Sequence, residues 1–343
     1  MVLERLVGAP LRRPPQAGAN LDVVVPLAQR HIAQARQTGD PRELGYAQGL
    51  LQPWWNEVDA PVPVLLLRAT LRQARHDFGG ALEDLDRVVE QQPQNAQAWL
   101  TRATVLRVQG HFPEALKACG ALKGQVDPFI DALCTQAVRG LNGELAPALA
   151  EMERMRPRLA AQPVDIAAWF EAEHALMAVR SGRAEEALAL YSAALIRHPG
   201  DLNLRAEYAD LLLDSDQATT VLELIPESAG ADALQLRRAL ALHALSDPAF
   251  SAHHQRILDG FAAARRRDEA LHLREEARYL LATADDPRAA LQLAQQNWRI
   301  QREPPDARVL LQAAAAAGDS AAAEPVRQWL RQTGLEDARL TTP

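Results

Sequence analysis

Two neighbouring segments of this 343-residue chain match each other at a fixed spacing of 34 residues. The matching positions are Leu65 with Trp99, Arg68 with Arg102, Ala69 with Ala103, Thr70 with Thr104, Phe78 with Phe112, Ala81 with Ala115, Leu82 with Leu116, and Val88 with Leu122. A repeat of this length indicates stacked structural units that each contact their neighbours, in place of one closed core. The spacing therefore predicts a solenoid.

Length and composition agree with a helical solenoid. The chain exceeds the roughly 250 to 300 residues at which a single hydrophobic core stops growing, and a solenoid needs no central core. Hydrophobic residues make up 48% of the chain and aromatic residues only 5%, with alanine and leucine filling the difference. Apolar residues three and four apart, as at Leu21, Val24, Val25 and Ala28, predict helices from position 21 onward.

The repeating residues resemble the 34-residue tetratricopeptide repeat. The matching residues are Pro93, Trp99, Gly110, Phe112, Ala115 and Leu122 in one unit, and Gly182, Ala187, Tyr191, Ala194 and Pro199 in another. The resemblance implies an all-α fold, a right-handed superhelical solenoid of about eight antiparallel helix pairs. The order of segments is also similar to that of uncharacterised bacterial repeat proteins that are usually made with an export signal.

The pattern divides the chain into four parts. Residues 1–20 hold three prolines and little apolar periodicity, so we expect an irregular leader. Residues 21–61 are expected to hold a degenerate helical pair and a linker, and residues 62–228 the repeat array. Residues 229–343 are expected to form divergent pairs and a C-terminal cap.

The charge of the chain argues against a general polyanion binder. It has 37 basic and 44 acidic residues, a net charge of −7 and a pI near 5.8, so we expect no nucleic-acid partner. No apolar run approaches the roughly 18 to 20 residues that cross a bilayer, so no membrane insertion is expected. The start lacks an apolar signal core, but signal peptides are removed from mature proteins. The resemblance to exported proteins favours a soluble periplasmic protein over a cytoplasmic one.

No catalytic or metal-binding motif is recognisable. The chain lacks the His-Glu-x-x-His and Gly-x-Ser-x-Gly patterns and the glycine-rich phosphate loop. His253 and His254 are adjacent, and neighbours on a helix point about 100° apart, which makes them poor co-ligands and favours an exposed polar pair. Glu275 and Glu276 are interpreted in the same way, as part of a solvated helix face. We therefore expect no enzyme, no metal and no cofactor.

Cys119 and Cys134 are the only two cysteines. They fall on the second helix of one unit and the first helix of the next, which lie side by side in this architecture, so a disulfide is geometrically possible. A pair of buried thiols in the cytosol is the alternative. The resemblance to exported proteins favours the disulfide.

Binding is expected on the concave surface, which the first helix of each pair lines in the family that the repeats resemble. The candidate binding residues at the corresponding positions are Thr70, Gln73, Gln97, Leu100, Thr104, Arg107, Trp169 and Leu176. The family's clamp of lysine and asparagine residues for chaperone tails does not map onto this chain, because Thr70 and Thr104 stand where its asparagines would be. Arg107 either receives an acidic group of a partner or pairs with a neighbour such as Glu114 or Asp77.

We interpret the chain as a non-catalytic scaffold that binds a protein or an extended peptide in its groove. One alternative is an assembly factor with a lateral interface, which a large exposed apolar patch on the convex side would favour. Another is an enzyme with a cleft between repeats, which a convergent cluster of buried titratable groups would favour. The sequence identifies neither the partner nor the oligomeric state.

Overall fold

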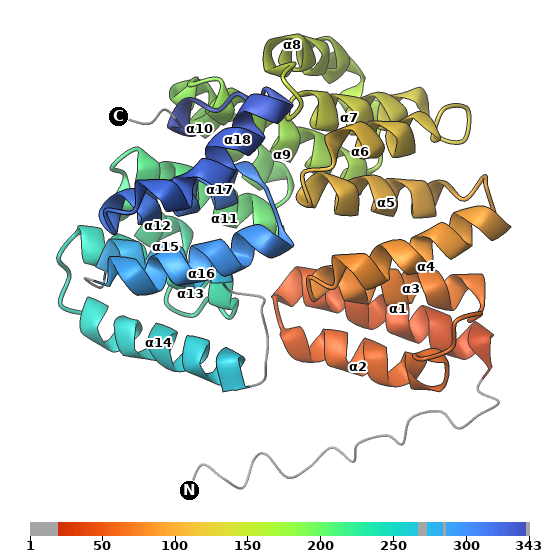
Figure 1. Ribbon diagram of the computed structural model, residues 1–343, viewed down its shortest axis with the longest axis horizontal. Helices are drawn as coiled ribbons and strands as arrows, with labels where there is room; N and C mark the ends of the chain where they lie inside the picture. The colour runs from red at the N-terminus through yellow and green to blue at the C-terminus, as the bar shows by residue number, and fades with distance from the viewer. Residues whose placement is uncertain (1–19, 267–272, 284–285, 341–343) are drawn as a thin grey trace, which may run out of the picture.

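The computed structural model describes residues 20–266, 273–283 and 286–340, and in these ranges the protein is built of helices that alternate as antiparallel pairs (Figure 1). The first helices of the pairs are α1 (Leu21–Thr38), α3 (Val62–Ala74), α5 (Ala96–Val108), α7 (Pro128–Arg139), α9 (Val164–Arg180), α11 (Leu202–Asp214), α13 (Asp232–Ala244), α15 (Leu273–Thr283) and α17 (Pro304–Ala316). The second helices are α2 (Pro41–Leu51), α4 (Phe78–Gln91), α6 (Phe112–Gly120), α8 (Leu145–Met155), α10 (Ala184–Arg197), α12 (Ala218–Leu224), α14 (Phe250–Arg266), α16 (Pro287–Ile300) and α18 (Glu324–Thr333).

The all-α solenoid expected from the repeats is confirmed, although the described chain holds nine pairs and not about eight. The second helices of the two clearest units begin at Phe78 and Phe112, as the 34-residue register predicts. The small residues Ala81, Ala115 and Ala187, expected where paired helices approach most closely, have no exposed surface. The boundary expected after residue 228 lies between α12 and α13, and the leader expected at 1–20 lies outside the described residues apart from Asn20, which caps α1.

A buried arginine ties the first pair to the second. Arg68 on α3 is 2% exposed and binds the carboxylate of Asp84 on α4, with 2.6 Å between Nη2 and Oδ1. Its Nη1 also donates to the backbone carbonyl oxygens of Trp54, Trp55 and Glu57 in the linker, at 2.8 to 2.9 Å. Buried carbonyl oxygens that lack a hydrogen bond destabilise a fold. The side chain of Arg68, which belongs to the second pair, supplies hydrogen bonds to three carbonyl oxygens of the linker.

The superhelix closes on itself because the last two pairs return to the third. Figure 1 shows the blue C-terminal helices beside the yellow and orange helices α5 to α7. Arg302, just after α16, donates its backbone N–H to the carbonyl oxygen of Val108 at the end of α5, at 2.8 Å. Trp329 on α18 packs against Phe112, with 5.8 Å between ring centroids, and at right angles against Trp298 on α16. One hydrophobic core therefore joins α5 to α7 with α15 to α18.

The chain after Trp329 follows the turns of three successive pairs; we call residues 329–340 the C-terminal segment. These turns hold Gly110, Gly143 and Gly182, each with φ of 75° to 76°. A Cβ at Gly110 would lie 2.8 Å from the indole nitrogen of Trp329, and one at Gly143 would lie 3.3 Å from a backbone oxygen of the C-terminal segment. A Cβ at Gly182, in the third turn, would lie 3.4 Å from the Cβ of Ala338.

A second closing contact lies at the other end of the array. Gly39, after α1, has φ of 70°, and a Cβ there would lie 2.9 Å from the Cβ of Ala231, just before α13. Helix α1 also contacts α11. Since both ends of the array meet its middle, the concave side of the solenoid is enclosed over much of its length.

Candidate functional site

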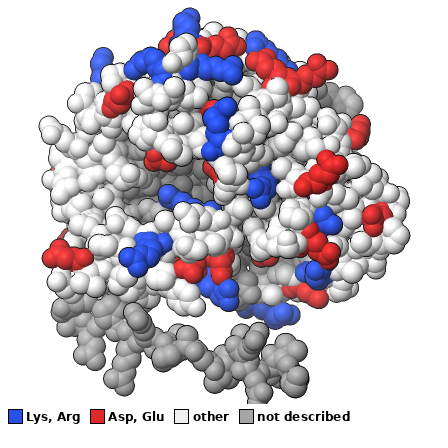
Figure 2. Space-filling model, turned by 180° about the vertical axis from the view of Figure 1, so that it is seen from behind, with Lys and Arg blue, Asp and Glu red and all other residues white. Residues whose placement is uncertain are grey.

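The first helices enclose a hollow of about 460 Å³. Its wall comes from α5, α9, α11, α13, α15 and α17, with Tyr191 from α10 and Arg339 from the C-terminal segment. The charged residues in the wall are Arg107, Arg180, Arg237, Arg274, Arg278, Arg308, Arg339, Glu173, Glu207, Asp210, Asp214, Glu275 and Glu303. Figure 2 shows a hollow near the middle of the molecule with basic and acidic side chains around it. The volume lies in the range of ligand pockets, roughly 300 to 1,000 Å³.

Most of these charges are paired across helices. Arg237 on α13 lies 2.7 Å from a carboxylate oxygen of Asp210 on α11 and 3.4 Å from one of Glu275 on α15. Arg278 binds the other oxygen of Asp210 at 2.6 Å. Burial alone would raise the pKa of Glu275, but the guanidinium groups of Arg237, Arg274 and Arg278 outweigh it and lower that pKa to about 2. Glu275 therefore stays ionised at neutral pH.

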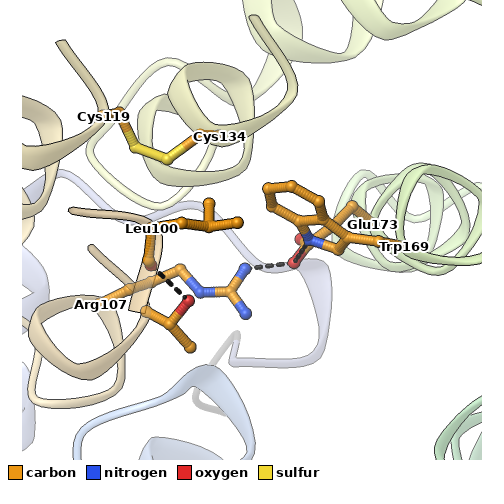
Figure 3. Close-up of a disulfide and its surroundings, with 7 residues drawn as sticks. Leu100, Arg107, Cys119, Cys134, Trp169 and Glu173 are labelled. Carbon is orange, nitrogen blue, oxygen red and sulfur yellow. Dashed lines mark hydrogen bonds and ion pairs between the residues drawn. A yellow bond between two sulfur atoms is a disulfide. The ribbon is translucent and has the colours of Figure 1, made fainter. Parts of the chain in front are cut away.

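Arg107 on α5 points into this hollow and binds Glu173 on α9 (Figure 3). The neighbours expected to pair with it, Glu114 and Asp77, are not its partners. Burial would lower the pKa of Arg107, but Glu173 and Glu303 raise it above the usual value. Arg107 is therefore not a free cation at the surface of the groove. Loss of Arg107 would leave Glu173 unpaired inside the protein.

The structure brings four of the eight candidate binding residues together. Leu176 and Arg107 line the hollow, and Trp169 and Leu100 pack beside Arg107 (Figure 3). The indole nitrogen of Trp169 donates to the carboxylate of Glu173 at 3.4 Å. These residues come from α5 and α9, which the Arg107–Glu173 ion pair joins.

The other four candidates do not line the hollow. The hydroxyls of Thr70 and Thr104 donate to backbone carbonyls one turn earlier in their own helices. Gln97 is exposed and donates its amide to Thr101, and Gln73 is half-buried on α3. Their role in binding stays a prediction.

A protonated carboxyl group is the most unusual feature of the hollow. Glu207 on α11 accepts a hydrogen bond from the hydroxyl of Tyr191 on α10, at 3.2 Å. Burial and the nearby charge of Glu173 raise the pKa of Glu207 to about 8. Burial also raises the pKa of Tyr191 well above its usual value. At pH 7 both groups therefore carry their protons.

Glu207 and Arg180 are functional candidates that the repeat pattern did not predict. For Arg180 the sequence did hold a signal, because it is a charged residue in a stretch, Trp169 to Arg180, that is otherwise mostly apolar. Such a helix is covered on most sides, so its charged residues must face a polar interior.

Two sequence interpretations of paired residues are wrong. Glu275 and Glu276 are not a solvated face, because Glu275 lies in the hollow and Glu276 is 8% exposed and pairs with Arg265. The adjacent histidines are not an exposed pair either. His253 is 4% exposed, and His254 contacts the hydroxyl of Tyr279 at 3.0 Å through Nδ1.

One group of side chains in the described ranges has the spacing of a metal site. Atoms of Glu153, His174 and Glu186, on three successive helices, lie within 4.8 Å of one another. The guanidinium of Arg183 already lies 3.3 Å and 3.5 Å from the two carboxylates. These acids therefore have a cation partner within the chain, and we assign no metal to them.

Cys119 on α6 and Cys134 on α7 are joined by a disulfide, with 5.6 Å between their Cα atoms (Figure 3). Both residues are buried in the core that the C-terminal helices share. The bridge thus staples two of the pairs whose turns the C-terminal segment covers.

No family model matches this chain, and no curated protein matches it. Among solved structures, the chain is similar to a thermophilic TPR protein of Thermus thermophilus, with 23% identity, 54% of this chain and 99% of that chain covered, and a TM-score of 0.43. It is also similar to a tetratricopeptide repeat protein from Parabacteroides merdae, with 13% identity, 84% of this chain and 99% of that chain covered, and a TM-score of 0.43.

The class of protein follows from the chain itself. Helix pairs begin at the positions that the 34-residue register assigns, and alanines pack without exposed surface where the repeat requires small residues. The described chain is thus an all-α helical-repeat protein whose two clearest units keep the 34-residue register. None of its described helices has both the length and the apolar character needed to cross a membrane.

Proposed function

We propose that this chain is a non-catalytic scaffold that holds a short segment of another protein, or an extended peptide, against the inner faces of its first helices. The observation that carries the proposal is the hollow, because the first helices of six pairs converge on it and leave space for a ligand. A rigid preformed surface lowers the ordering cost of binding. The volume suits a few side chains of a partner and not a whole domain.

A variant that fills the hollow tests this proposal. Leu176→Trp places a bulky side chain in the hollow from α9, whereas Ile196→Trp places the same side chain on α10 at a position that is 79% exposed. We expect the wild-type and Ile196→Trp proteins to capture the same partner from a cell extract, and Leu176→Trp to lose it. Equal melting temperatures of the three proteins exclude unfolding as the cause. Undiminished capture by Leu176→Trp would place the partner elsewhere.

Glu207 supports a second candidate function, since a buried carboxyl group with a pKa near 8 beside a tyrosine hydroxyl is suited to proton transfer. In this alternative the hollow is the cleft of an enzyme, with Glu207, which is protonated at pH 7, as general acid. Ligand recovered from the native protein is incubated with fresh wild-type and Glu207→Gln proteins and analysed by mass spectrometry. Conversion by the wild type alone favours the enzyme, and recovery of unchanged ligand favours the scaffold.

We also propose that the protein works in an oxidising compartment such as the periplasm. The support is the Cys119 to Cys134 bridge, because disulfides persist in oxidising compartments and are rare in the cytosol.

A further inference from the structure

The side chain of Arg180, at the end of α9, lines the hollow without a carboxylate partner. It is 5% exposed, and its one hydrogen bond within the described chain runs from Nη1 to the backbone oxygen of Gly140, at 2.8 Å. A guanidinium has five N–H groups, so most of its donors remain for another acceptor. The close approach depends on glycine, because a Cβ at position 140 would lie 2.9 Å from Nη2 of Arg180.

Arg180 differs in this respect from the six other arginines in the wall. Each of those has a carboxylate oxygen within 4.0 Å among the described residues. Arg237, for example, is buried to the same degree but has both Asp210 and Glu275 beside it. Arg180 is therefore the exception in a wall where charges are otherwise matched.

An unpaired buried charge destabilises a fold, since desolvation is not offset by a partner. Burial accordingly lowers the pKa of Arg180 to about 10, so the group is still charged at pH 7. Groups that weaken the folded state in this way are concentrated at functional sites. The other guanidinium donors of Arg180 have no acceptor within the described chain, and in the hollow they can be satisfied by a bound water, ion or ligand.

The balance of charge around the hollow selects the sign of that ligand. Seven arginines and six carboxyl groups line it, and Asp306 and Asp337 pair with Arg274 and Arg339 from outside the lining, so the one arginine in the wall without a carboxylate oxygen of the described residues within 4.0 Å is Arg180. A planar guanidinium matches the two oxygens of a carboxylate or phosphate group. The volume of about 460 Å³ fits a small molecule.

We propose that the hollow binds a small organic anion whose carboxylate or phosphate group is held by Arg180. The proposal does not rest on the binding of a protein segment, and its occupant is different. A small anion can enter the hollow by itself, whereas a protein segment needs an opening in the wall that is wide enough for its backbone. The same oxyanion chemistry can also be offered by an acidic peptide, so the test includes both sources.

The test measures the melting temperature as sodium phosphate or sodium succinate is added at constant ionic strength. We expect a saturable rise for the wild type, because a ligand that binds only the folded state stabilises it. Arg180→Met should lose this rise. Arg154→Met, which removes one positive charge from an exposed position on α8, should keep it. Without added anion, Arg180→Met should melt at the same or a higher temperature, since an unpaired buried charge is gone, whereas a purely structural arginine would give a lower one.

Gly140→Ala is a second variant, which keeps the charge of Arg180 but displaces its guanidinium. The anion concentration that gives half of the rise in melting temperature should be at least several-fold higher in this variant than in the wild type. Phosphate also stabilises proteins without binding a site, but that effect grows without saturation and is the same in all variants. A rise that is identical in wild type and Arg180→Met overturns the proposal. A saturable rise with a capped tetraglutamate peptide, and none with phosphate or succinate, also overturns it in favour of a peptide.

Discussion

The turns between paired helices fall into two regions, in which different residue types adopt a backbone conformation with positive φ. Under the C-terminal segment, the residues with positive φ are glycines, and these are Gly110, Gly143 and Gly182. In the turns after α3, α11 and α13 the same conformation is held by residues with side chains, and these are His76, Asp216 and Ser246. A left-handed backbone alone therefore does not require glycine in this chain.

The difference shows that a covered turn needs space as well as conformational freedom. Gly110 has no room for a Cβ because Trp329 and Arg302 lie against it. Gly318, in the turn after α17, has the same positive φ but nothing within 4 Å of a Cβ. The glycine of the repeat pattern is thus a docking position for the C-terminal segment at some turns and only a turn residue at others.

The largest expected effect comes from removing the residue that docks. Trp329→Ala takes away the contacts with Phe112 and Trp298 and leaves a cavity in the core that joins the third pair to the last two. Loss of a buried tryptophan should lower the free energy of unfolding by about 3 to 5 kcal/mol in urea titrations. The half-buried Trp99, outside the C-terminal segment, is the matched control, and Trp99→Ala should cost clearly less. Equal losses would mean that docking adds nothing.

A pH-dependent prediction concerns Glu207 on α11, the first pair beyond the covered turns. Its pKa is about 8 in the folded protein against 4.5 as a reference, so the folded state keeps a proton that the unfolded state releases. This contribution to stability is fully present below pH 4.5 and is lost as pH rises to 8. Glu207→Gln should therefore gain stability over wild type across this range, on the order of 3 to 5 kcal/mol at the upper end. Parallel stability curves from pH 5 to pH 8 would contradict the raised pKa.

The disulfide should stabilise the covered region. A bridge that closes a loop of about 15 residues contributes roughly 3 kcal/mol, so Cys119→Ser with Cys134→Ser should lower stability by this amount under oxidising conditions. Under reducing conditions, wild type and variant should unfold alike. Titration of thiols in the denatured, non-reduced protein provides the direct check. Two reactive thiols would remove both the bridge and the case for an oxidising compartment.

Two alanine substitutions separate space from conformation. Gly110→Ala adds a Cβ in both a left-handed backbone and a crowded site, and the two costs together should be about 2 to 4 kcal/mol. Gly318→Ala adds only the backbone cost, about 1 to 2 kcal/mol. In the Trp329→Ala background the cost at Gly110 should approach that at Gly318. A cost that is unchanged in this double variant would show that the tryptophan is not what crowds the turn.

The smallest effect is expected in a turn outside the C-terminal segment. Asp216 has φ of 57°, so Asp216→Gly removes the backbone strain but adds flexibility to the unfolded chain. These changes oppose each other, and thermal unfolding should show a difference below about 1 kcal/mol. A loss of several kcal/mol would mean that the aspartate side chain contributes contacts that set this turn apart.

The sequence predicted those parts of the fold that depend on local spacing. The helix starts at Phe78 and Phe112 and the buried alanines follow from the repeat register, because each unit contacts mainly its neighbours. The return of α18 to α6 was not predictable in this way. The repeat register does not identify Phe112 as the partner of Trp329. Contacts between distant segments produce no periodic pattern in the sequence.

The candidate site was predicted only in part for the same reason. Leu176 and Arg107 were placed on the concave side by the repeat register, and they do line the hollow. Glu173 was not expected as the partner of Arg107, because it lies two pairs further along the chain. The adjacent acids at 275 and 276 were interpreted as solvated because no local pattern shows that the superhelix closes over the first of them.

The contact between Arg302 and Val108 has a consequence for how the chain is made. Open repeat arrays fold from any point outward, but this array is complete only when helices near the C-terminus reach α5 and α6. The chain is synthesised from its N-terminus, so the apolar surface around Phe112 stays uncovered until Trp329 has left the ribosome. Closing so long a loop is slow relative to pairing neighbouring helices. Nascent chains that end before α18 should therefore be the species that depend most on chaperones.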